Sequence, residues 1–436
     1  MMSLTPNLLL QNVIPAGDGF DGKKKVSIRI KDGTISEISA KLKPADGEEI
    51  FDAEGAFVSG GWMDMHVHFR EPGFEHKETI ETGCRSAAFG GFTEVACMPN
   101  TKPAIHTRDV VEFIRKKAES EAVDVHPIGC VTKERAGKSI AEMADMKNGG
   151  AIAFSDDGDP VYSSQVMRVA LEYSSMLEVP IINHEEDLEL SRPGHMNEGN
   201  VSTRLGLDGT PGIAEETMIA RDILLAGFTG GHIHVAHIST RKGVDLVRKA
   251  KQEGVKVTTE VCTHHFDLND EEVEKRQFDT NVKMHPPLRT RDDVDAMIEG
   301  LSDGTIDVIC TDHAPHSVDE KEVEFIYAPN GIIGLDTAWS ISVKRLLKTG
   351  KLSLEQLLEK LVINPRKILN LHVPVLKEGS PANLTVFNTD EEWVYGAGEV
   401  RSKSKNSPYI GEKMTGRAVA IYNKNRFVEN KLKGRG

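Results

Sequence analysis

The chain has 436 residues, of which 39% are hydrophobic and 28% are charged, and its formal net charge is −14. This composition is that of an ordinary globular protein, and the length suits an α/β barrel with a small second domain. The acidic balance excludes general nucleic-acid binding, which needs a basic surface to neutralise phosphates.

Residues 1–6 lack the basic stretch and the apolar run of a signal peptide. Because no run of about 18 apolar residues occurs in the chain, we expect no membrane span. The cysteines are scattered and form no Cys-x-x-Cys pair, which argues against a disulfide framework and against a cysteine zinc site. They are Cys84, Cys97, Cys130, Cys262 and Cys310. A reducing compartment fits this pattern, and we expect a cytoplasmic protein.

Both ends of the chain carry short, alternating apolar segments typical of β strands. Asp32-Gly33 between two such segments is a strong hairpin signal. The expected strands are 7–13, 25–31, 34–39, 383–387, 393–395 and 417–422. Because chain termini usually lie close together, we predict that residues 1–59 and 372–436 form one small β-sandwich domain. The alternative is two separate β appendages.

Residues 60–371 alternate short apolar strands with amphipathic helices. The strands are expected at 62–68, 92–97, 123–128, 151–154, 179–183, 232–237, 256–261 and 306–310. Helical patterns include 109–118, 164–177, 215–226 and 242–252. This alternation predicts a (β/α)8 barrel, in which catalytic residues lie at the carboxyl ends of the strands.

The first barrel strand ends in His66-Val-His68. Positions two apart in a strand face the same side, so both imidazoles can reach one ion in the mouth of the barrel. Such a pair is a weak signal alone, but later strands also end in ligand residues. These are Asp156 or Asp157, His184, His237 and Asp312. Imidazole and carboxylate ligands suit zinc, and a carboxylate shared between two ions would permit a two-metal site.

The other histidines are weaker candidates. Those near strand ends favour a supporting or structural role, and they are His232, His234, His264 and His265. Those in predicted loops are expected at the surface, and they are His76, His106, His195 and His372.

Several motifs resemble one family. They are Asp-Met-His-Val-His-Phe-Arg-Glu-Pro-Gly at 64–73, Met-Pro-Asn-Thr at 98–101, Phe-Ser-Asp-Asp-Gly at 154–158, Thr-Asp-His-Ala-Pro-His at 311–316 and Ser-Lys-Ser-Lys-Asn-Ser-Pro-Tyr-Ile-Gly at 402–411. Together they are similar to the bacterial type I dihydroorotases of the amidohydrolase superfamily. The resemblance implies a barrel with a β-sandwich domain, one or two zinc ions, and interconversion of dihydroorotate and carbamoyl aspartate in pyrimidine biosynthesis.

The resemblance also implies how the ligands are divided. A first zinc would be held by His66, His68, Asp157 and Asp312, and a second by Asp157, His184 and His237. It selects Asp157 over Asp156, a choice that spacing alone leaves open. Hydantoinases and allantoinases place a carboxylated lysine in this region, so an aspartate favours the dihydroorotase interpretation.

Substrate contacts follow from the same resemblance. The expected substrate-binding residues are His68, Arg70, Asn100, His285, His316, Asn330 and Gly331. Among them, Arg70, Asn100 and His316 would bind the substrate's carboxylate, since a guanidinium matches a carboxylate bidentately. The alternative for Arg70 is a structural ion pair with Glu71 or Glu75.

Two positions depart from the family pattern. His285 precedes Pro-Pro-Leu-Arg where relatives usually have asparagine, which puts substrate affinity and its pH dependence in question. Asn383 stands where relatives often have aspartate, and a structural role is expected for it.

Hydrolysis of a cyclic amide needs an active nucleophile, a polarised carbonyl and a proton for the leaving nitrogen. Asp312 is the candidate to accept the proton of the attacking oxygen and pass it to nitrogen. Two alternatives remain: a hydantoinase or allantoinase, and a non-catalytic relative that serves as a scaffold for a partner enzyme. We expect a small-molecule substrate, no membrane partner and a homo-oligomer, and the resemblance implies that association with aspartate transcarbamoylase occurs in some relatives.

Overall fold

The computed structural model describes residues 4–17, 19–191 and 193–432. Residues 1–3 and 433–436, which belong to the predicted β domain, lie outside these ranges. The prediction that residues 1–6 are no signal peptide therefore falls partly on residues that are not described. Within the described ranges, no helix is both long and apolar enough to cross a membrane.

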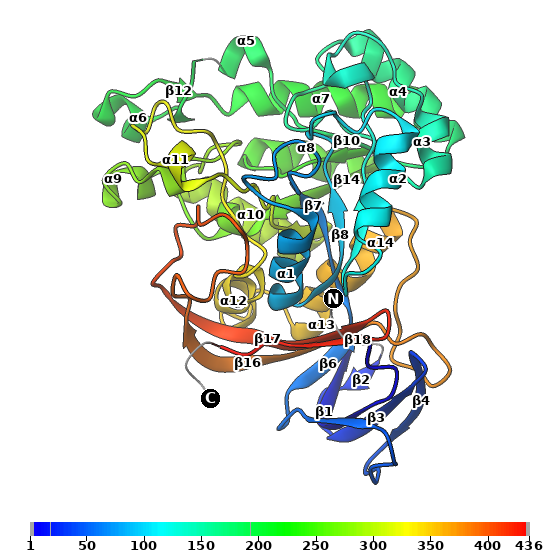
Figure 1. Cartoon of the computed structure of the whole chain (residues 1–436). Coiled ribbons are helices and arrows are strands. Elements are labelled where there is room, and N and C mark those ends of the chain that lie inside the picture. Colours follow the sequence, from blue (N-terminus) through cyan, green and yellow to red (C-terminus); the bar gives the residue numbers. More distant parts are fainter. Residues whose placement is uncertain (1–3, 18, 192, 433–436) are drawn as a thin grey trace.

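Strands from both ends of the described chain pair in one curled sheet of nine strands (Figure 1). They are β1 (Leu8–Gly17), β2 (Phe20–Asp21), β3 (Val26–Lys31), β4 (Thr34–Ser39), β5 (Glu49–Asp52), β6 (Phe57–Gly60), β16 (Leu384–Val394), β17 (Lys413–Asn423) and β18 (Arg426–Glu429). The two ends meet at β6, where Phe57 pairs with Ile14 of β1 and Val58 pairs with Val386 of β16. This pairing excludes two separate β appendages.

The sheet differs from the expected strands in two respects. It contains β2, β5, β6 and β18, which were not expected from the sequence. Residues 383–387 and 393–395 do not form two strands, because β16 runs through both and its register shifts between Asn388 and Glu392. Seven of the nine strands follow one hydrogen-bonded path, β2 and β5 pair with β1 beside it, and the sheet curls around a shared apolar core. Asn383 donates to the Glu94 carboxylate at 2.9 Å, a structural contact.

The middle of the chain forms the barrel. Its strands are β7 (Trp62–Val67), β8 (Phe92–Cys97), β9 (Asp124–Pro127), β10 (Ile181–Asn183), β13 (Ile233–Val235), β14 (Val257–Cys262) and β15 (Val308–Cys310). The predicted strand at 151–154 is not regular: within it only Phe154 forms bridges, to Gly129 and to Ile181. The ring closes where Val67 bridges His313.

Helices alternate with these strands and surround them (Figure 1). They are α1 (Ile80–Gly90), α2 (Arg108–Lys117), α3 (Met143–Gly149), α4 (Ser164–Met176), α5 (Leu188–Ser191), α6 (Asn200–Leu205), α7 (Ile213–Thr229), α8 (Arg241–Gln252), α9 (Glu272–Lys275), α10 (Arg291–Asp303), α11 (Val318–Lys321), α12 (Ala338–Ser342), α13 (Leu354–Leu358) and α14 (Asn364–Ile368). Sequence signals set their limits: the Thr79 side chain caps the start of α1, and Gly91 ends it at a φ of 96° that favours glycine.

Trp62 joins the barrel to the curled sheet. Its ring lies 4.5 Å from that of Trp339 and 5.1 Å from that of Phe387 in β16, measured between centroids. Since Trp62 begins β7, the sheet packs at the amino end of this strand. His66 and His68 lie away from the sheet: they are at the carboxyl end of this strand, which is the mouth of the barrel.

Candidate active site

The structure brings together all six residues that the sequence predicts as metal ligands. His66 and His68 lie at the carboxyl end of β7. The other four come shortly after later strands of the barrel, where the irregular segment 151–154 counts as one strand: Asp157, His184, His237 and Asp312. All six side chains are buried, with residue exposures between 0% and 4%. Ionisable side chains are rarely buried so deeply unless they are paired or bind an ion.

Four of these side chains converge on one point. Asp157 Oδ2 lies 3.5 Å from His66 Nε2 and 3.4 Å from His68 Nε2. Asp312 Oδ1 lies 3.7 Å and 2.9 Å from the same two nitrogens. Four ligands at zinc-like distances of about 2.0–2.1 Å from a tetrahedral centre would be about 3.4 Å apart. The observed separations bracket this value.

The second oxygen of Asp157 faces a second group. Asp157 Oδ1 lies 3.5 Å from His184 Nδ1 and 3.2 Å from His237 Nε2, and these two nitrogens are 3.0 Å apart. One carboxylate thus serves two neighbouring sets of ligand atoms, one with each oxygen. This is the arrangement that a shared ligand between two metal ions requires.

Hydrogen bonds on the far sides of the rings decide what faces the centre. His66 Nδ1 lies 2.5 Å from the Glu260 carboxylate, which can only accept when ionised, so Nδ1 carries a proton and Nε2 is the nitrogen left to face the centre. His68 Nδ1 lies 2.8 Å from Asn100 Oδ1, with the same consequence. Both Nε2 atoms therefore face the oxygen of Asp312. Burial opposes a charge on His66, but Glu260, Asp157 and Asp312 raise its pKa well above the usual value, so a proton on His66 supplies the positive charge when no metal is bound. Acceptors that face one another in a buried space need a cation between them, so these residues fit a divalent metal.

The charges in the cluster follow the same pattern. Burial opposes the charge on Asp312, but attraction from His66 and the contact with His68 lower the pKa of its carboxyl to about 2. Burial likewise opposes the charge on Asp157, whereas His66, His184 and His237 hold its pKa well below the usual range. Both carboxylates are therefore ionised at neutral pH and available as ligands.

Arg70 lies beside this cluster as a buried cation. Its exposure is 8%, and its Nε donates to the Pro315 carbonyl oxygen at 3.2 Å. No carboxylate of the described residues forms an ion pair with Arg70, so the alternative of a structural pair with Glu71 or Glu75 fails in the described chain. A buried guanidinium without an anion is unfavourable, and it becomes favourable when an anionic ligand binds.

His316 lies on the same side of the mouth as Arg70. Its Nδ1 is 3.4 Å from Lys77 Nζ and 3.5 Å from the carboxylate of Glu320. Burial, together with repulsion from Arg70 and Lys77, lowers the pKa of His316 to about 3. His316 is therefore a neutral ring at physiological pH, and it can contribute a hydrogen bond to a ligand but no charge.

Three further residues were predicted to contact the substrate, and they differ in their exposure and in their hydrogen-bond partners. Asn100 contacts His68, as described above, and Asn330 is exposed. Both backbone groups of Gly331 already have partners: its N–H donates to the Lys283 carbonyl oxygen at 2.9 Å, and its carbonyl accepts from Lys321 and from Asn406. This residue therefore shapes the wall of the mouth.

Comparisons with known proteins agree with this geometry. A family model described as "Dihydro-orotase-like" matches residues 55–243. A dihydroorotase of Citrifermentans bemidjiense is 49% identical over 425 residues, which cover 97% of this chain and 99% of that relative. A dihydroorotase of Acetivibrio thermocellus is 48% identical over 409 residues, with coverage of 93% and 95%. The chain belongs to the dihydroorotase family.

Solved structures give the same fold. An L-hydantoinase from Arthrobacter aurescens superposes with a TM-score of 0.86 at 25% identity, covering 99% of this chain and 97% of that one. The predicted barrel with a β domain from both chain ends is therefore confirmed. Dihydroorotases are cyclic amidohydrolases, so the chain is an enzyme of this type, and the near-full-length identity to dihydroorotases outweighs the hydantoinase alternative.

His285, one of the two positions expected to depart from the family pattern, contacts a neighbouring carboxylate. Its Nε2 lies 2.9 Å from Glu186 Oε1, and its ring stacks on His184 with centroids 5.2 Å apart. Burial, the largest influence, lowers the pKa of His285, although Glu186 opposes this shift. The histidine is thus held over one of the predicted ligands.

Several residues that hold the ligands were not singled out from the sequence. Glu260 accepts a hydrogen bond from His66 Nδ1 on the side of the ring that faces away from the cluster. The Asp64 carboxylate accepts from the Thr311 hydroxyl at 2.5 Å, and this contact joins β7 to the end of β15, next to Asp312. A buried glutamate inside an apolar strand is the signal that could have identified Glu260. Asp156, the alternative to Asp157, accepts from Thr132 N at 3.0 Å and is directed away from the cluster.

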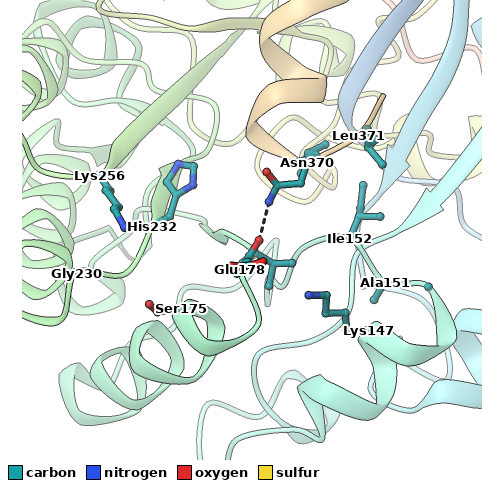
Figure 2. Close-up of a pocket in the computed structure, with 13 residues that line it drawn as sticks. Lys147, Ala151, Ile152, Ser175, Glu178, Gly230, His232, Lys256, Asn370 and Leu371 are labelled. Atoms are coloured by element: carbon teal, nitrogen blue, oxygen red, sulfur yellow. Dashed lines mark hydrogen bonds between the residues drawn. The ribbon is translucent and has the colours of Figure 1, made fainter. Parts of the chain in front are cut away.

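The other histidines follow their expected places only in part. His264 and His265 are buried beside the mouth, where His265 donates to the Pro286 carbonyl oxygen at 2.9 Å. His232 lines a hollow of about 870 Å³ at the amino ends of the strands, the end opposite the ligands (Figure 2). His76 and His372 are exposed, whereas His106 and His195, which were expected at the surface, are half-buried.

Proposed function

We propose that the chain is a zinc-dependent dihydroorotase that interconverts N-carbamoyl-L-aspartate and L-dihydroorotate. The observation that carries the substrate assignment is Arg70, a buried cation without an anionic partner in the described chain, next to a cluster suited to a divalent metal. A carboxylated ring would supply the missing negative charge, whereas a neutral hydantoin would leave it unpaired.

The proposed metal ligands are the six converging side chains. His66, His68, Asp157 and Asp312 would hold one zinc, and Asp157, His184 and His237 would hold a second where it is present. Their donor atoms, imidazole nitrogen and carboxylate oxygen, suit zinc. When bound, zinc polarises the amide carbonyl and lowers the pKa of a water molecule to about 7.

The protein's own part in the reaction centres on Asp312. In the hydrolytic direction its carboxylate accepts the proton of the attacking water and passes it to the ring nitrogen as the carbon–nitrogen bond breaks. Its low pKa keeps the carboxylate ionised and ready to accept at neutral pH. In the biosynthetic direction the same transfers run backwards and close the ring.

Arg70, Asn100 and His316 would orient the substrate through its free carboxylate. The guanidinium offers two parallel donors, and the neutral His316 ring adds one more. Holding the ring in this way fixes the position of the reacting carbonyl relative to Asp312. The entropy cost of bringing the reacting groups together is then met by substrate binding and not in the chemical step. His285, Asn330 and Gly331 would complete the wall around the ring.

A substrate panel on protein of measured zinc content tests the proposal. Dihydroorotate and carbamoyl aspartate should be turned over, and hydantoin and allantoin should be far poorer substrates. Removal of metal with a chelator should abolish the activity, and added zinc should restore it. Better turnover of hydantoin than of dihydroorotate would refute the substrate assignment, and full activity without metal would refute the zinc requirement.

We also propose that the enzyme is a homo-oligomer. Adjacent helices α4 and α7 expose large apolar side chains, among them Met176 at 81%, Leu224 at 74% and Phe228 at 71%. A second copy of the chain would remove this surface from water. The mass in solution, measured by light scattering, tests this: a monomer at micromolar concentration would contradict it.

A further inference from the structure

The segment between β16 and β17 crosses from the curled sheet to the mouth of the barrel. We call residues 401–407 the C-terminal brace. All of this segment except Arg401 lies within the motif at 402–411 that resembles the family but has no assigned role in the reaction. In the structure it contacts three separate parts of the mouth: the region after β7, the segment after β15, and the loop at Gly331.

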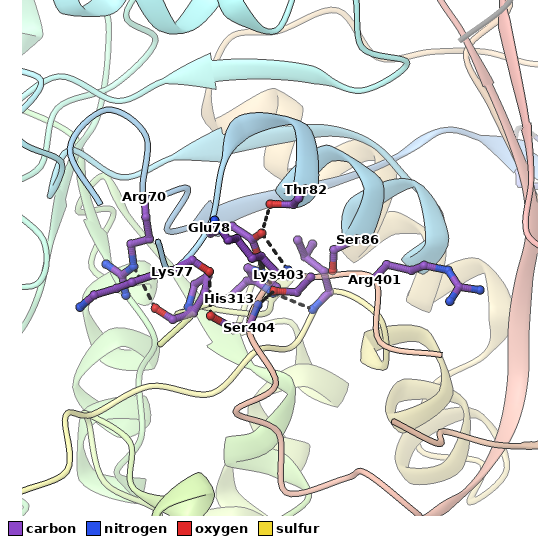
Figure 3. Close-up of polar contacts among 12 residues, drawn as sticks. Arg70, Lys77, Glu78, Thr82, Ser86, His313, Arg401, Lys403 and Ser404 are labelled. Carbon is purple, nitrogen blue, oxygen red and sulfur yellow. Dashed lines mark hydrogen bonds and ion pairs between the residues drawn. The ribbon is translucent and has the colours of Figure 1, made fainter. Parts of the chain in front are cut away.

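One end of the brace is anchored at the start of α1 (Figure 3). Glu78 is fully buried and accepts from the Ser402 hydroxyl and from Lys403 N, the latter at 3.0 Å. The same carboxylate lies 3.3 Å from His313 Nε2. Ser404 Oγ donates to the Lys77 carbonyl oxygen at 2.7 Å. This end therefore holds the brace against the loop that begins at Arg70.

The other end of the brace is Asn406, which is 2% exposed. Its Oδ1 accepts from the backbone N–H of His316 at 3.0 Å. Its Nδ2 donates to the Ala314 carbonyl oxygen at 2.9 Å and to the Gly331 carbonyl oxygen at 3.0 Å. One side chain thus uses both of its donors and its acceptor to join the His316 segment to the Gly331 loop.

The contact between these two segments is close. A Cβ atom added to Gly331 would lie 2.6 Å from the Ala314 carbonyl oxygen and 2.7 Å from His316 Cδ2, so only glycine fits there. The loop therefore packs directly on the His316 ring. Any loosening of the Asn406 bridge would let the ring move relative to Arg70, whose own guanidinium is fixed by the neighbouring Pro315 carbonyl.

We infer that Asn406 is a positioning residue for substrate recognition: it sets the place of His316 against Arg70 and so holds the carboxylate clamp in its binding geometry. The inference rests on the proposed function, because the clamp matters only for a carboxylated substrate. Asparagine is required by its hydrogen-bonding groups. Aspartate has the same shape but cannot donate to two carbonyl oxygens, and leucine has nearly the same shape but can neither donate nor accept.

The test compares Asn406→Asp and Asn406→Leu with a matched control, Asn430→Asp. Asn430 Nδ2 also donates to backbone carbonyls, those of Ala88 at 3.0 Å and Phe89 at 3.1 Å, but at the opposite end of α1 from Glu78. KM and kcat for dihydroorotate, zinc content and the free energy of unfolding are measured for each variant. We expect both Asn406 variants to raise KM about tenfold or more, the effect of losing one or two buried hydrogen bonds, with kcat and zinc content nearly unchanged.

Asn430→Asp should lower stability by a similar amount and leave KM as in the unmodified enzyme. An increase in KM for Asn406→Asp but not for Asn406→Leu would assign the effect to the added charge and overturn the inference. Unchanged KM in both variants, with stability losses like that of the control, would make Asn406 merely structural. If the unmodified enzyme does not act on dihydroorotate at all, the proposed function fails, which is a separate result.

Discussion

Replacing Arg70 with methionine should separate substrate affinity from stability. In the free enzyme Arg70 is buried, and no carboxylate of the described chain pairs with it. A methionine of similar length removes the charge and keeps much of the apolar contact. We therefore expect Arg70→Met to bind dihydroorotate much more weakly and yet to unfold no more easily than the unmodified enzyme.

The size of both effects follows from the geometry. A bidentate contact with a carboxylate comprises two charge-assisted hydrogen bonds of about 1.5–3 kcal/mol each. Because about 1.4 kcal/mol corresponds to a factor of ten, KM should rise by about a hundredfold or more. Replacing a buried charge by an apolar side chain is often neutral or stabilising by about 1–4 kcal/mol, so the free energy of unfolding should stay equal or rise.

Arg366 provides the matched control. It is also buried, but its Nη2 lies 2.9 Å from Glu94 Oε1. Arg366→Met would leave that carboxylate without its cation and should lower the free energy of unfolding by about 3–5 kcal/mol. Steady-state kinetics and urea denaturation of both variants give the comparison. The reasoning is refuted if Arg70→Met is destabilised as much as Arg366→Met, or if its KM for dihydroorotate is unchanged.

Three further predictions concern the mouth of the barrel. Asp312→Asn should abolish turnover while circular dichroism shows an unchanged fold, and substantial remaining activity would remove Asp312 from proton transfer. Glu260→Gln should weaken zinc binding by about 10–100-fold in titrations against a competing chelator, since Glu260 orients His66; equal affinity would contradict this role. Burial lowers the pKa of Lys321 from 10.5 to about 7, so the unfolded chain binds more protons between these values and stability should rise with pH across that range. Lys321→Met should show a flatter pH dependence of its melting temperature, and an identical slope would argue against a buried amine with a lowered pKa.

The sequence was sufficient for the features that depend on strand order. Parallel strands deliver the residues that follow them to one mouth, so His184, His237 and Asp312 could be expected near His66 from their places after strands alone. The hairpin at Asp32-Gly33 was equally clear, and it joins β3 and β4 with residues 31 and 34 paired. Local rules of this kind need no knowledge of distant contacts.

Other features depend on distant side chains, and spacing along the chain alone does not predict these contacts. Glu260 meets His66 across 194 positions, and Asn406 meets Ala314 across 92. The choice between Asp156 and Asp157 rests on Thr132, which binds the first and leaves the second to face the cluster. The irregular segment at 151–154 looked like a strand because its apolar pattern is right. In the structure, bridges form only at Phe154 of this segment.

The pairing of β6 with strands from both ends of the chain has a consequence for synthesis. The barrel strands and the proposed metal ligands leave the ribosome before β16 and β17 exist, whereas β6 waits for β16 to cover its open edge. The brace lies between those two late strands, so it leaves the ribosome after β16 and before β17. A nascent chain can thus gather its ligand residues early, but it acquires a finished substrate pocket only when nearly the whole polypeptide has been translated.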